Sequence, residues 1–223
     1  MAKKKTVEIT KDAIVALYTD YILTQGKKPN SVYEFAKNNQ IEESSFYKFY
    51  SSFDALEEHY FSDMCHYTIE LLTTSSEYEN YDVAQKLSGF YFTFFELSTA
   101  NRSFVLHILQ HEKLKFKNVM KLKLLRKDFL TYVKNILDTP YAIGNPKIDK
   151  IQNRFLHEGA WWQFMSIIKY WMEDSSVNFE NTDIYIEKSI KAGFEIAYNF
   201  PLESVLDFGK FIWKEKFGNF ESK

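Results

Sequence analysis

A stretch early in the chain decides the fold: residues 31–56, which read SVYEFAKNNQIEESSFYKFYSSFDAL. Ser31 and Glu34 have the spacing of a capping box, in which each side chain satisfies the other's backbone N–H, and they predict a short helix through Lys37. Residues 38–40 predict a tight turn, because Asn tolerates the left-handed conformation that ends many helices. A second short helix is then expected over residues 43–49.

Helices are also expected on both sides of this stretch. Upstream, apolar side chains recur every three or four residues from Ile14 to Ile22, with Thr10 in place for an N-cap and Gly26 for a C-cap. This pattern predicts a helix over residues 11–25. Downstream, Ser52 can cap a further helix. The order of helix, short helix, tight turn and helix is that of a helix-turn-helix unit.

The residues quoted above resemble the DNA-binding signature of TetR-family transcriptional regulators. The resemblance lies in spacing and in particular positions: Ala36 where two helices cross, Tyr47 and Tyr50 at the end of the recognition helix, and Leu56 in the next helix. It implies an all-α protein that binds DNA as a homodimer and holds a hydrophobic small molecule in its C-terminal domain. Binding of that molecule would release the DNA. A ligand-responsive regulator acting as a repressor is therefore the first hypothesis.

The rest of the chain favours a larger helical domain. The resemblance here lies in the number and order of the helices, and in residues 181–183, which open one of them. We expect a helix-turn-helix domain over residues 1–60 and a ligand-binding and dimerisation domain over residues 61–223, with a dimer seam implied between the fourth and fifth of its long helices. These long helices are predicted over residues 82–100, 103–112, 115–137, 147–173, 182–199 and 202–217.

The family pattern places the DNA-facing side chains in and just after the recognition helix. The resemblance implies contacts to the major groove or its phosphates from Ser44, Ser45, Tyr47 and Lys48, whose hydroxyl and amine donors suit phosphate oxygens. A DNA-reading domain also needs a basic face, because phosphate neutralisation supplies most of its non-specific affinity. The other side chains predicted to contribute to such a face are Lys3, Lys4, Lys5, Lys27 and Lys28.

Three residues depart from the family pattern and open a second hypothesis. Glu42 and Glu43 stand at the start of the recognition helix, where many members carry small, polar or basic residues, and Phe53 stands where they carry a phosphate-binding lysine. Residues 1–60 hold eight lysines against nine acidic side chains, a net charge of −1 that disfavours DNA binding. The alternative is a TetR-fold lipid- or isoprenoid-binding accessory protein that no longer reads DNA.

Basic charge is concentrated in the predicted helix within residues 113–137. This segment holds eight basic side chains and only Asp128 as an acid, a net charge of +7. Two interpretations stay open. The lysines can form the solvated face of a core helix, or they can meet an anionic partner such as lipid headgroups or an acidic protein.

Aromatic side chains crowd the C-terminal part, in a chain with 21 Phe, 15 Tyr and 4 Trp. Ligand pockets are mostly apolar with a few polar groups, so these rings predict either a close-packed core or a cavity for a flat or long hydrophobic ligand. Histidines on the same helices could orient such a ligand. The predicted ligand-binding residues are Phe90, Phe94, Phe104, His107, His111, His157, Trp161 and Phe164.

The remaining composition narrows the classes of function. Gly (7) and Pro (4) are scarce in the 223 residues, which argues against a sandwich or barrel with its frequent turns. His107 and His111 would share a helix face, but without an HExxH motif or cysteine support we expect no metal site and no cofactor. The lone Cys65 excludes an intramolecular disulfide framework and is expected to be buried.

Catalysis and a membrane anchor are not expected either. The sequence carries neither a nucleophile elbow nor a phosphate-cradling glycine loop, so we do not expect an enzyme. No apolar run approaches the length of a membrane span, and the first residues lack the apolar core of a signal peptide. We therefore expect a cytoplasmic protein.

Overall fold

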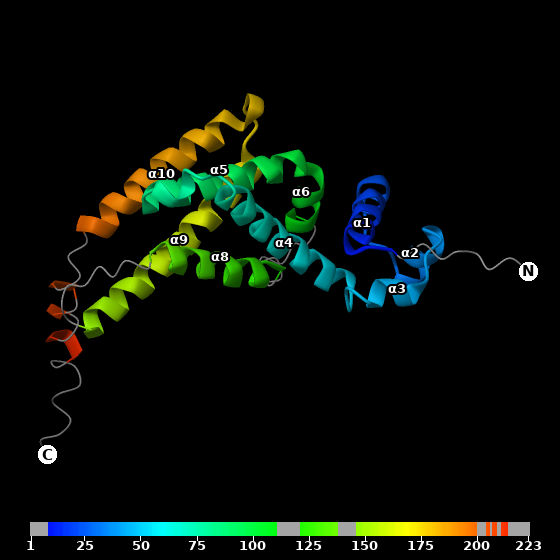
Figure 1. Ribbon diagram of the computed structural model, residues 1–223, viewed down its shortest axis with the longest axis horizontal. Helices are drawn as coiled ribbons and strands as arrows, with labels where there is room; N and C mark the ends of the chain where they lie inside the picture. The colour runs from blue at the N-terminus through cyan, green and yellow to red at the C-terminus, as the bar shows by residue number, and fades with distance from the viewer. Residues whose placement is uncertain are drawn as a thin grey trace, which may run out of the picture. The chain divides into compact units, whose positions relative to one another are not determined.

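The protein is helical throughout the part that its computed structural model describes: residues 9–110, 121–137, 146–199, 204–205, 207–208 and 211–213 (Figure 1). None of these residues forms a β-strand, which confirms the all-α fold class. Within the described residues, no helix combines the length and the apolar character that crossing a bilayer requires.

The first three helices follow the expected helix-turn-helix order. They are α1 (Lys11–Gln25), α2 (Val32–Asn38) and α3 (Glu43–Tyr47). The Thr10 hydroxyl oxygen accepts a hydrogen bond from the Ala13 backbone N–H at 3.2 Å, and Gly26 closes α1 with a left-handed φ of 66°. Both caps of α1 were predicted from the sequence and are confirmed, because the side chain and the glycine supply what the helix ends lack.

The turn between α2 and α3 differs in detail from the prediction. Ser31 caps α2 through the Glu34 N–H, but the Glu34 carboxylate accepts from the Asn30 side-chain amide at 2.7 Å, so the reciprocal half of the capping box is not formed. The left-handed residue is Gln40, with φ of 55°, while Asn39 donates its side-chain amide to the Phe35 carbonyl. Helix α3 ends at Tyr47, two residues before the expected end.

The Phe53 side chain packs into the aromatic core of the helix-turn-helix. Its ring stacks on Tyr18 with centroids 5.1 Å apart, and it meets the edges or faces of Phe35 and Phe46 at 5.6 and 5.2 Å. Tyr18, Phe35 and Phe46 are fully buried. The departure from a phosphate-binding lysine at this position therefore has a packing reason, since ring pairs in these geometries add to the stability of burial.

Longer helices make up the rest of the described chain. Several match the predicted ranges within a few residues, and the first part of the helix predicted over residues 115–137 lies outside the described residues. The predicted helix over residues 202–217 falls only partly within the described residues, which are helical there. The elements are α4 (Phe53–Thr73), η1 (Tyr78–Asn80), α5 (Val83–Ala100), α6 (Arg102–Gln110), α8 (Lys123–Ile136), α9 (Pro146–Glu173), η2 (Val177–Phe179) and α10 (Glu180–Asn199).

The chain divides into two compact units. Unit 1 comprises residues 1–79 and 92–129, and unit 2 comprises residues 80–91 and 130–223. The predicted domain boundary at residue 60 lies inside α4, a continuous helix of 21 residues that Ser52 caps through the Ala55 N–H. Unit 1 thus contains the helix-turn-helix together with α4, α6 and parts of α5 and α8. Residues of α5 and α8 occur in both units.

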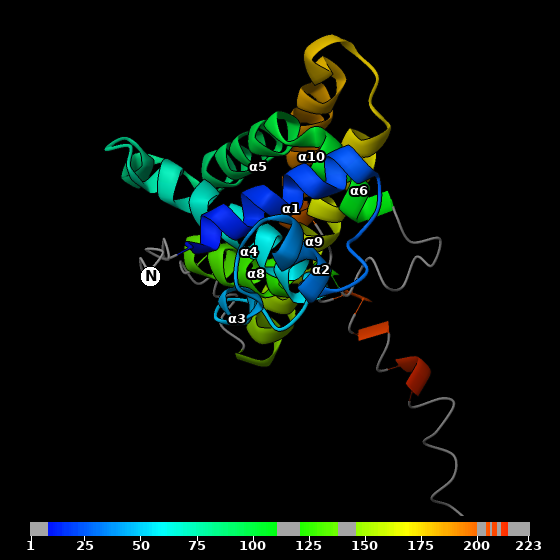
Figure 2. The ribbon, with the colours of Figure 1, turned by 90° about the vertical axis from the view of Figure 1, so that its right-hand side faces the viewer.

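In unit 2, α10 packs back along α9 after a short connection (Figure 2). The Asp174 carboxylate organises this connection, accepting hydrogen bonds from the Thr182 N–H at 2.9 Å and the Thr182 hydroxyl at 2.7 Å. Although burial alone would raise it, the pKa of Asp174 is lowered by these bonds and by those from Ser176. The result is a fixed helical pair that carries the candidate pocket described below.

Candidate functional site

Helix α3 presents a polar face away from the aromatic core. Phe46 is fully buried, whereas Ser44 and Lys48 are exposed, Tyr47 is 52% exposed and Ser45 is half-buried. Helix α3 therefore packs into the core through Phe46 and presents hydroxyl and ammonium donors on its other side. The side chains predicted from the family pattern to face DNA are brought together on this one surface element.

The same element carries the acidic pair noted in the sequence. Glu42 is exposed and Glu43 half-buried, and Glu42, in the N-cap position, makes no side-chain capping bond. The Tyr47 hydroxyl donates to the Glu43 carboxylate at 3.4 Å, within one turn of α3. Carboxylates beside the candidate donors oppose the approach of phosphate, because like charges repel across a few ångströms.

Lys28 has a different role from the predicted DNA contact. Its ammonium group donates to Asp54 at 2.5 Å and to Glu57 at 2.9 Å, and only a quarter of its side chain (25%) is exposed. Two carboxylates therefore compensate its charge inside unit 1, and we omit Lys28 from the candidate DNA face. Lys3, Lys4 and Lys5 lie outside the described residues.

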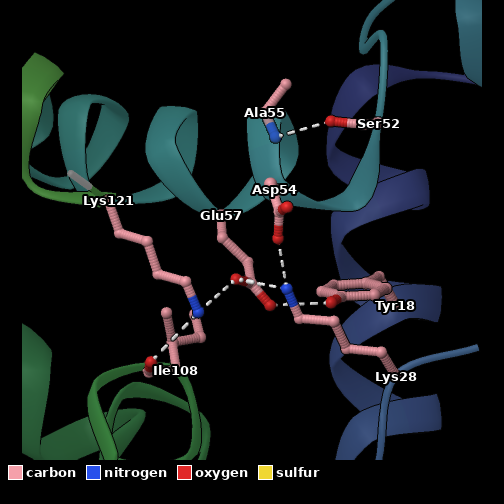
Figure 3. Close-up of polar contacts among 8 residues, drawn as sticks. All are labelled: Tyr18, Lys28, Ser52, Asp54, Ala55, Glu57, Ile108 and Lys121. Atoms are coloured by element: carbon pink, nitrogen blue, oxygen red, sulfur yellow. Dashed lines mark hydrogen bonds and ion pairs between the residues drawn. The ribbon is translucent and has the colours of Figure 1, made fainter. Parts of the chain in front are cut away.

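Glu57 is the centre of a buried polar network in unit 1 (Figure 3). It is fully buried on α4, and its carboxylate accepts from the Tyr18 hydroxyl at 2.8 Å and from Lys28. A third donor is Lys121, whose ammonium group lies 3.0 Å from the carboxylate and 3.4 Å from the Ile108 carbonyl oxygen. The network thus joins α1, the segment after α1, α4, α6 and Lys121, two positions before α8.

The network is close to electrically balanced. Two ammonium groups, Lys28 and Lys121, face Asp54 and Glu57, and Lys121 is only 5% exposed. Burial and the adjacent Glu57 charge raise the pKa of the Tyr18 hydroxyl, which stays protonated and donates its hydrogen bond. This arrangement was not predicted, because Lys121 falls within the basic segment for which we considered only a solvated face or a contact with an anionic partner.

The basic segment is accordingly less uniform than its sequence suggests. Lys121 is buried, and the one acid, Asp128, accepts from Ser62 at 2.5 Å and lies 3.4 Å from His66. Exposed basic side chains remain on α8 at Lys123, Lys127 and Lys134, while the segment's first three lysines lie outside the described residues.

Unit 2 contains an apolar pocket of about 440 Å³ between the start of α5, the end of α8, α9 and α10. This volume is within the range of small-molecule sites. Small side chains on the two facing helices make the space: Gly159 and Ala160 on α9, Ala192 and Gly193 on α10. The apolar lining includes Val83, Leu87, Val133, Ile136, Leu156, Trp162 and Ile196.

The polar side chains among the described lining residues are Gln163, Ser166 and Ser189. The Gln163 amide lies between the buried Tyr91 hydroxyl, 3.2 Å from its oxygen, and the Ser189 hydroxyl, 3.4 Å from its nitrogen. Gly193 allows this placement, since a β-carbon there would come within 3.3 Å of the Gln163 nitrogen. No charged side chain is among the described residues that line the pocket.

Of the predicted ligand-binding residues, none of those that the structure describes lines this pocket, and they are divided between the two units. In unit 2, Phe90 and Trp161 pack against the ring of Phe164 at 5.6 and 5.9 Å, closing the core behind the pocket. His157 on α9 is half-buried, and burial lowers its pKa. The aromatic rings of this unit fill its core, and the pocket lies where smaller residues leave space.

The unit 1 members of the predicted set also serve packing. Phe104 of α6 meets the rings of Tyr18 and Tyr60 at 6.0 and 5.0 Å, and Phe94 is buried beside Phe95. His107 is half-buried on α6, and His111 lies outside the described residues. Among the described residues, no group of three or more His, Cys, Asp or Glu side chains could hold a metal ion, and Cys65 is buried.

A helix-turn-helix that is followed along the chain by helices enclosing an apolar pocket is the architecture of a one-component regulator. Residues 86–212 match the family model described as the tetracyclin repressor-like C-terminal domain. The chain therefore belongs to the TetR family of regulators, and its fold is TetR-like. No curated protein and no solved structure matches it.

Proposed function

We propose that the protein is a ligand-responsive repressor that binds DNA as a homodimer through α3 and holds a hydrophobic molecule in the pocket of unit 2. The observation that carries the DNA part is the exposed polar face of α3, where Ser44, Tyr47 and Lys48 are presented by a helix-turn-helix. Helices of this kind enter the major groove and position themselves through phosphate contacts.

Lys48 provides a direct test of this face. Changing Lys48 to alanine should weaken binding to DNA from upstream of the protein's own coding sequence, and should lower the salt slope of log K by about 1. Gel shifts over a salt series measure both quantities. The matched control is Lys134→Ala, which removes the same charge from an exposed position on α8. Equal behaviour of the two variants, or no discrete complex with the wild-type protein at micromolar concentration, would contradict DNA reading by α3.

The pocket supports the ligand part of the proposal. Its lining is mostly apolar, with polar groups at one place, as expected of a site that holds and orients a small molecule. Gly159 lies in the interior of α9, and no atom lies within 4 Å of the position that a β-carbon would take there. A β-carbon at this position therefore meets no neighbour, and a side chain that continues from it occupies pocket volume.

Filling the pocket from Gly159 should abolish ligand uptake without unfolding the protein. We expect Gly159→Leu to reduce the affinity for the neutral fluorescent probe N-phenyl-1-naphthylamine at least tenfold, while the melting temperature stays the same or rises. Replacing a helix-interior glycine gains up to about 1 kcal/mol of helix propensity. Gly159→Ala is the control, since it gains the same propensity and leaves most of the volume open. Undiminished probe binding by Gly159→Leu would place the binding site elsewhere.

Exposed apolar side chains on α9 and α10 favour the homodimer. Trp162 is 69% exposed, Ile196 58% and Ile184 46%, and clusters of large apolar side chains on a soluble surface commonly mark interfaces. A symmetric dimer would place two copies of α3 on successive DNA half-sites. Sedimentation velocity measures this state directly.

Helix α8 offers a route by which the ligand can affect the helix-turn-helix. Its end contributes Val133 and Ile136 to the pocket, and Lys121, just before its start, is bonded to Glu57. Glu57 in turn holds Tyr18 of α1. We propose that a ligand favours one position of α8 and thereby one arrangement of this network, because a ligand shifts only an equilibrium whose states it binds unequally.

A second candidate is a lipid- or isoprenoid-binding accessory protein that no longer reads DNA. The observation that favours it is the pair Glu42 and Glu43 beside the candidate DNA contacts of α3. Native mass spectrometry with organic extraction of the purified protein separates the two functions when combined with the gel shift. A retained lipid together with no DNA complex supports the accessory protein, and a specific DNA complex contradicts it.

A further inference from the structure

We propose that the pocket selects an electrically neutral ligand: an apolar molecule with one hydrogen-bonding group, such as an amide, ester or alcohol, and not a carboxylate or phosphate. This inference rests on the proposed function, in which the pocket holds the effector. It is carried by the composition of the lining and by the hydrogen bonds that its polar side chains already make.

The described part of the lining offers an ionised ligand no side chain of opposite charge. Among the described lining residues there is no Lys, Arg, His, Asp or Glu, although such residues make up about a quarter of the chain (26% charged, plus 5 His). A carboxylate that enters such a site must lose its hydration shell, and the single remaining N–H of Gln163 replaces only a small part of it. The lining therefore discriminates against an ionised ligand through the cost of an unpaired charge.

The polar side chains define what the ligand's single polar group can be. The Ser166 hydroxyl donates to the backbone carbonyl of Gln163 at 2.7 Å, and the Ser189 hydroxyl donates to the backbone carbonyl of Ile186 at 3.0 Å. Both hydroxyl protons are therefore engaged within their own helices. Their oxygens can still accept. They suit a ligand O–H or N–H.

Gln163 supplies the complementary donor. Its amide nitrogen carries two protons, of which one is directed to Ser189, and the described residues provide no partner for the other. A ligand carbonyl can accept that second proton. Tyr91 and Gly193 hold the amide in place, the first by a hydrogen bond and the second by leaving room for it. A primary amide or hydroxyamide, which both donates and accepts, matches the three groups best.

The test compares two probes of equal chain length with the full-length protein, decanamide and decanoate, by isothermal titration calorimetry at pH 8. Decanoate is ionised there, because ordinary carboxyl pKa values lie several units lower. We expect decanamide to bind at least a hundredfold more tightly. Gln163→Leu should weaken decanamide about tenfold, in line with the loss of one hydrogen bond, and the Tyr91 hydroxyl keeps the Ala160 carbonyl, 3.2 Å away, as its acceptor.

The possible failures are distinguishable. Decanoate binding that equals or exceeds decanamide binding, and that is lost in Gly159→Leu, overturns the neutral-ligand inference and leaves the pocket as the ligand site. Binding of neither probe, or binding that Gly159→Leu leaves unchanged, overturns the proposed pocket function and this inference with it. Unchanged decanamide affinity in Gln163→Leu contradicts the role of the amide donor.

Discussion

Replacing Glu57 with glutamine is expected to lower the free energy of unfolding by about 3–5 kcal/mol, the usual effect of removing one partner of a buried ion pair. Glutamine has nearly the same shape, so packing around α4 is preserved and the change is electrostatic. Lys121, which is 5% exposed, then lacks the carboxylate that compensates its charge. Chemical denaturation followed by circular dichroism measures the difference.

Two further variants separate the buried network from ordinary surface electrostatics. Lys11→Gln breaks the Lys11–Asp63 pair, whose side chains are 39% and 45% exposed, and should cost less than about 1 kcal/mol. Combining Glu57→Gln with Lys121→Met removes both charges and should recover most of the lost stability, since apolar replacements of buried ion pairs are often neutral. A loss below 1 kcal/mol for Glu57→Gln alone, or no recovery in the double variant, would contradict the electrostatic account.

The helix-turn-helix could be predicted from the sequence because local chemistry determines it. Thr10, Gly26, Ser31 and Ser52 act within one helical turn of their own positions, and each caps the helix that its spacing predicts. The detail that local rules missed is Gln40, which adopts the left-handed conformation in place of an asparagine. There the Asn39 side chain instead bonds the Phe35 carbonyl, so the turn closes one residue later.

The pocket was harder to predict because small side chains, and not large ones, create its space. The density of aromatic residues predicted Phe90, Trp161 and Phe164 as ligand contacts. Large rings fill space, however, and Phe90 and Trp161 both pack against Phe164. The informative residues are Gly159 and Gly193, which cost helix stability in the interiors of α9 and α10 and both line the pocket. Two such glycines in long helices are a usable sequence signal for a cavity.

The Glu57 network could not be predicted, because it depends on contacts between residues far apart in sequence. Glu57 is 39 positions from Tyr18 and 29 from Lys28. Lys121 is one of eight basic side chains in residues 113–137, and periodicity does not distinguish a lysine that pairs with a buried carboxylate from its exposed neighbours. Only the tertiary packing of α4 against α1 and α6 decides which lysine is buried.

Reversing the acidic pair at the start of α3 is expected to raise DNA affinity on the order of a hundredfold at low salt. Each change of Glu42 and Glu43 to lysine removes a repulsion and adds an attraction near the phosphates. By analogy with lysines near other anionic surfaces, the two effects together are worth roughly 1–1.5 kcal/mol for each residue changed. The gain should be largely independent of sequence. The slope of log K against log salt should steepen by about 0.9 for each phosphate that a new lysine neutralises.

Fluorescence anisotropy with a labelled upstream fragment and a scrambled duplex of the same length measures both effects over a salt series. The matched control reverses Glu77 and Glu79, two exposed acids outside α1–α3, and carries the same net charge. An equal gain for the control would mean that overall charge, and not the face of α3, governs association. If the α3 variant gains nothing, α3 does not approach DNA. The accessory-protein candidate then becomes the better account, because Glu42 and Glu43 would not meet DNA phosphates and their charge would oppose no function.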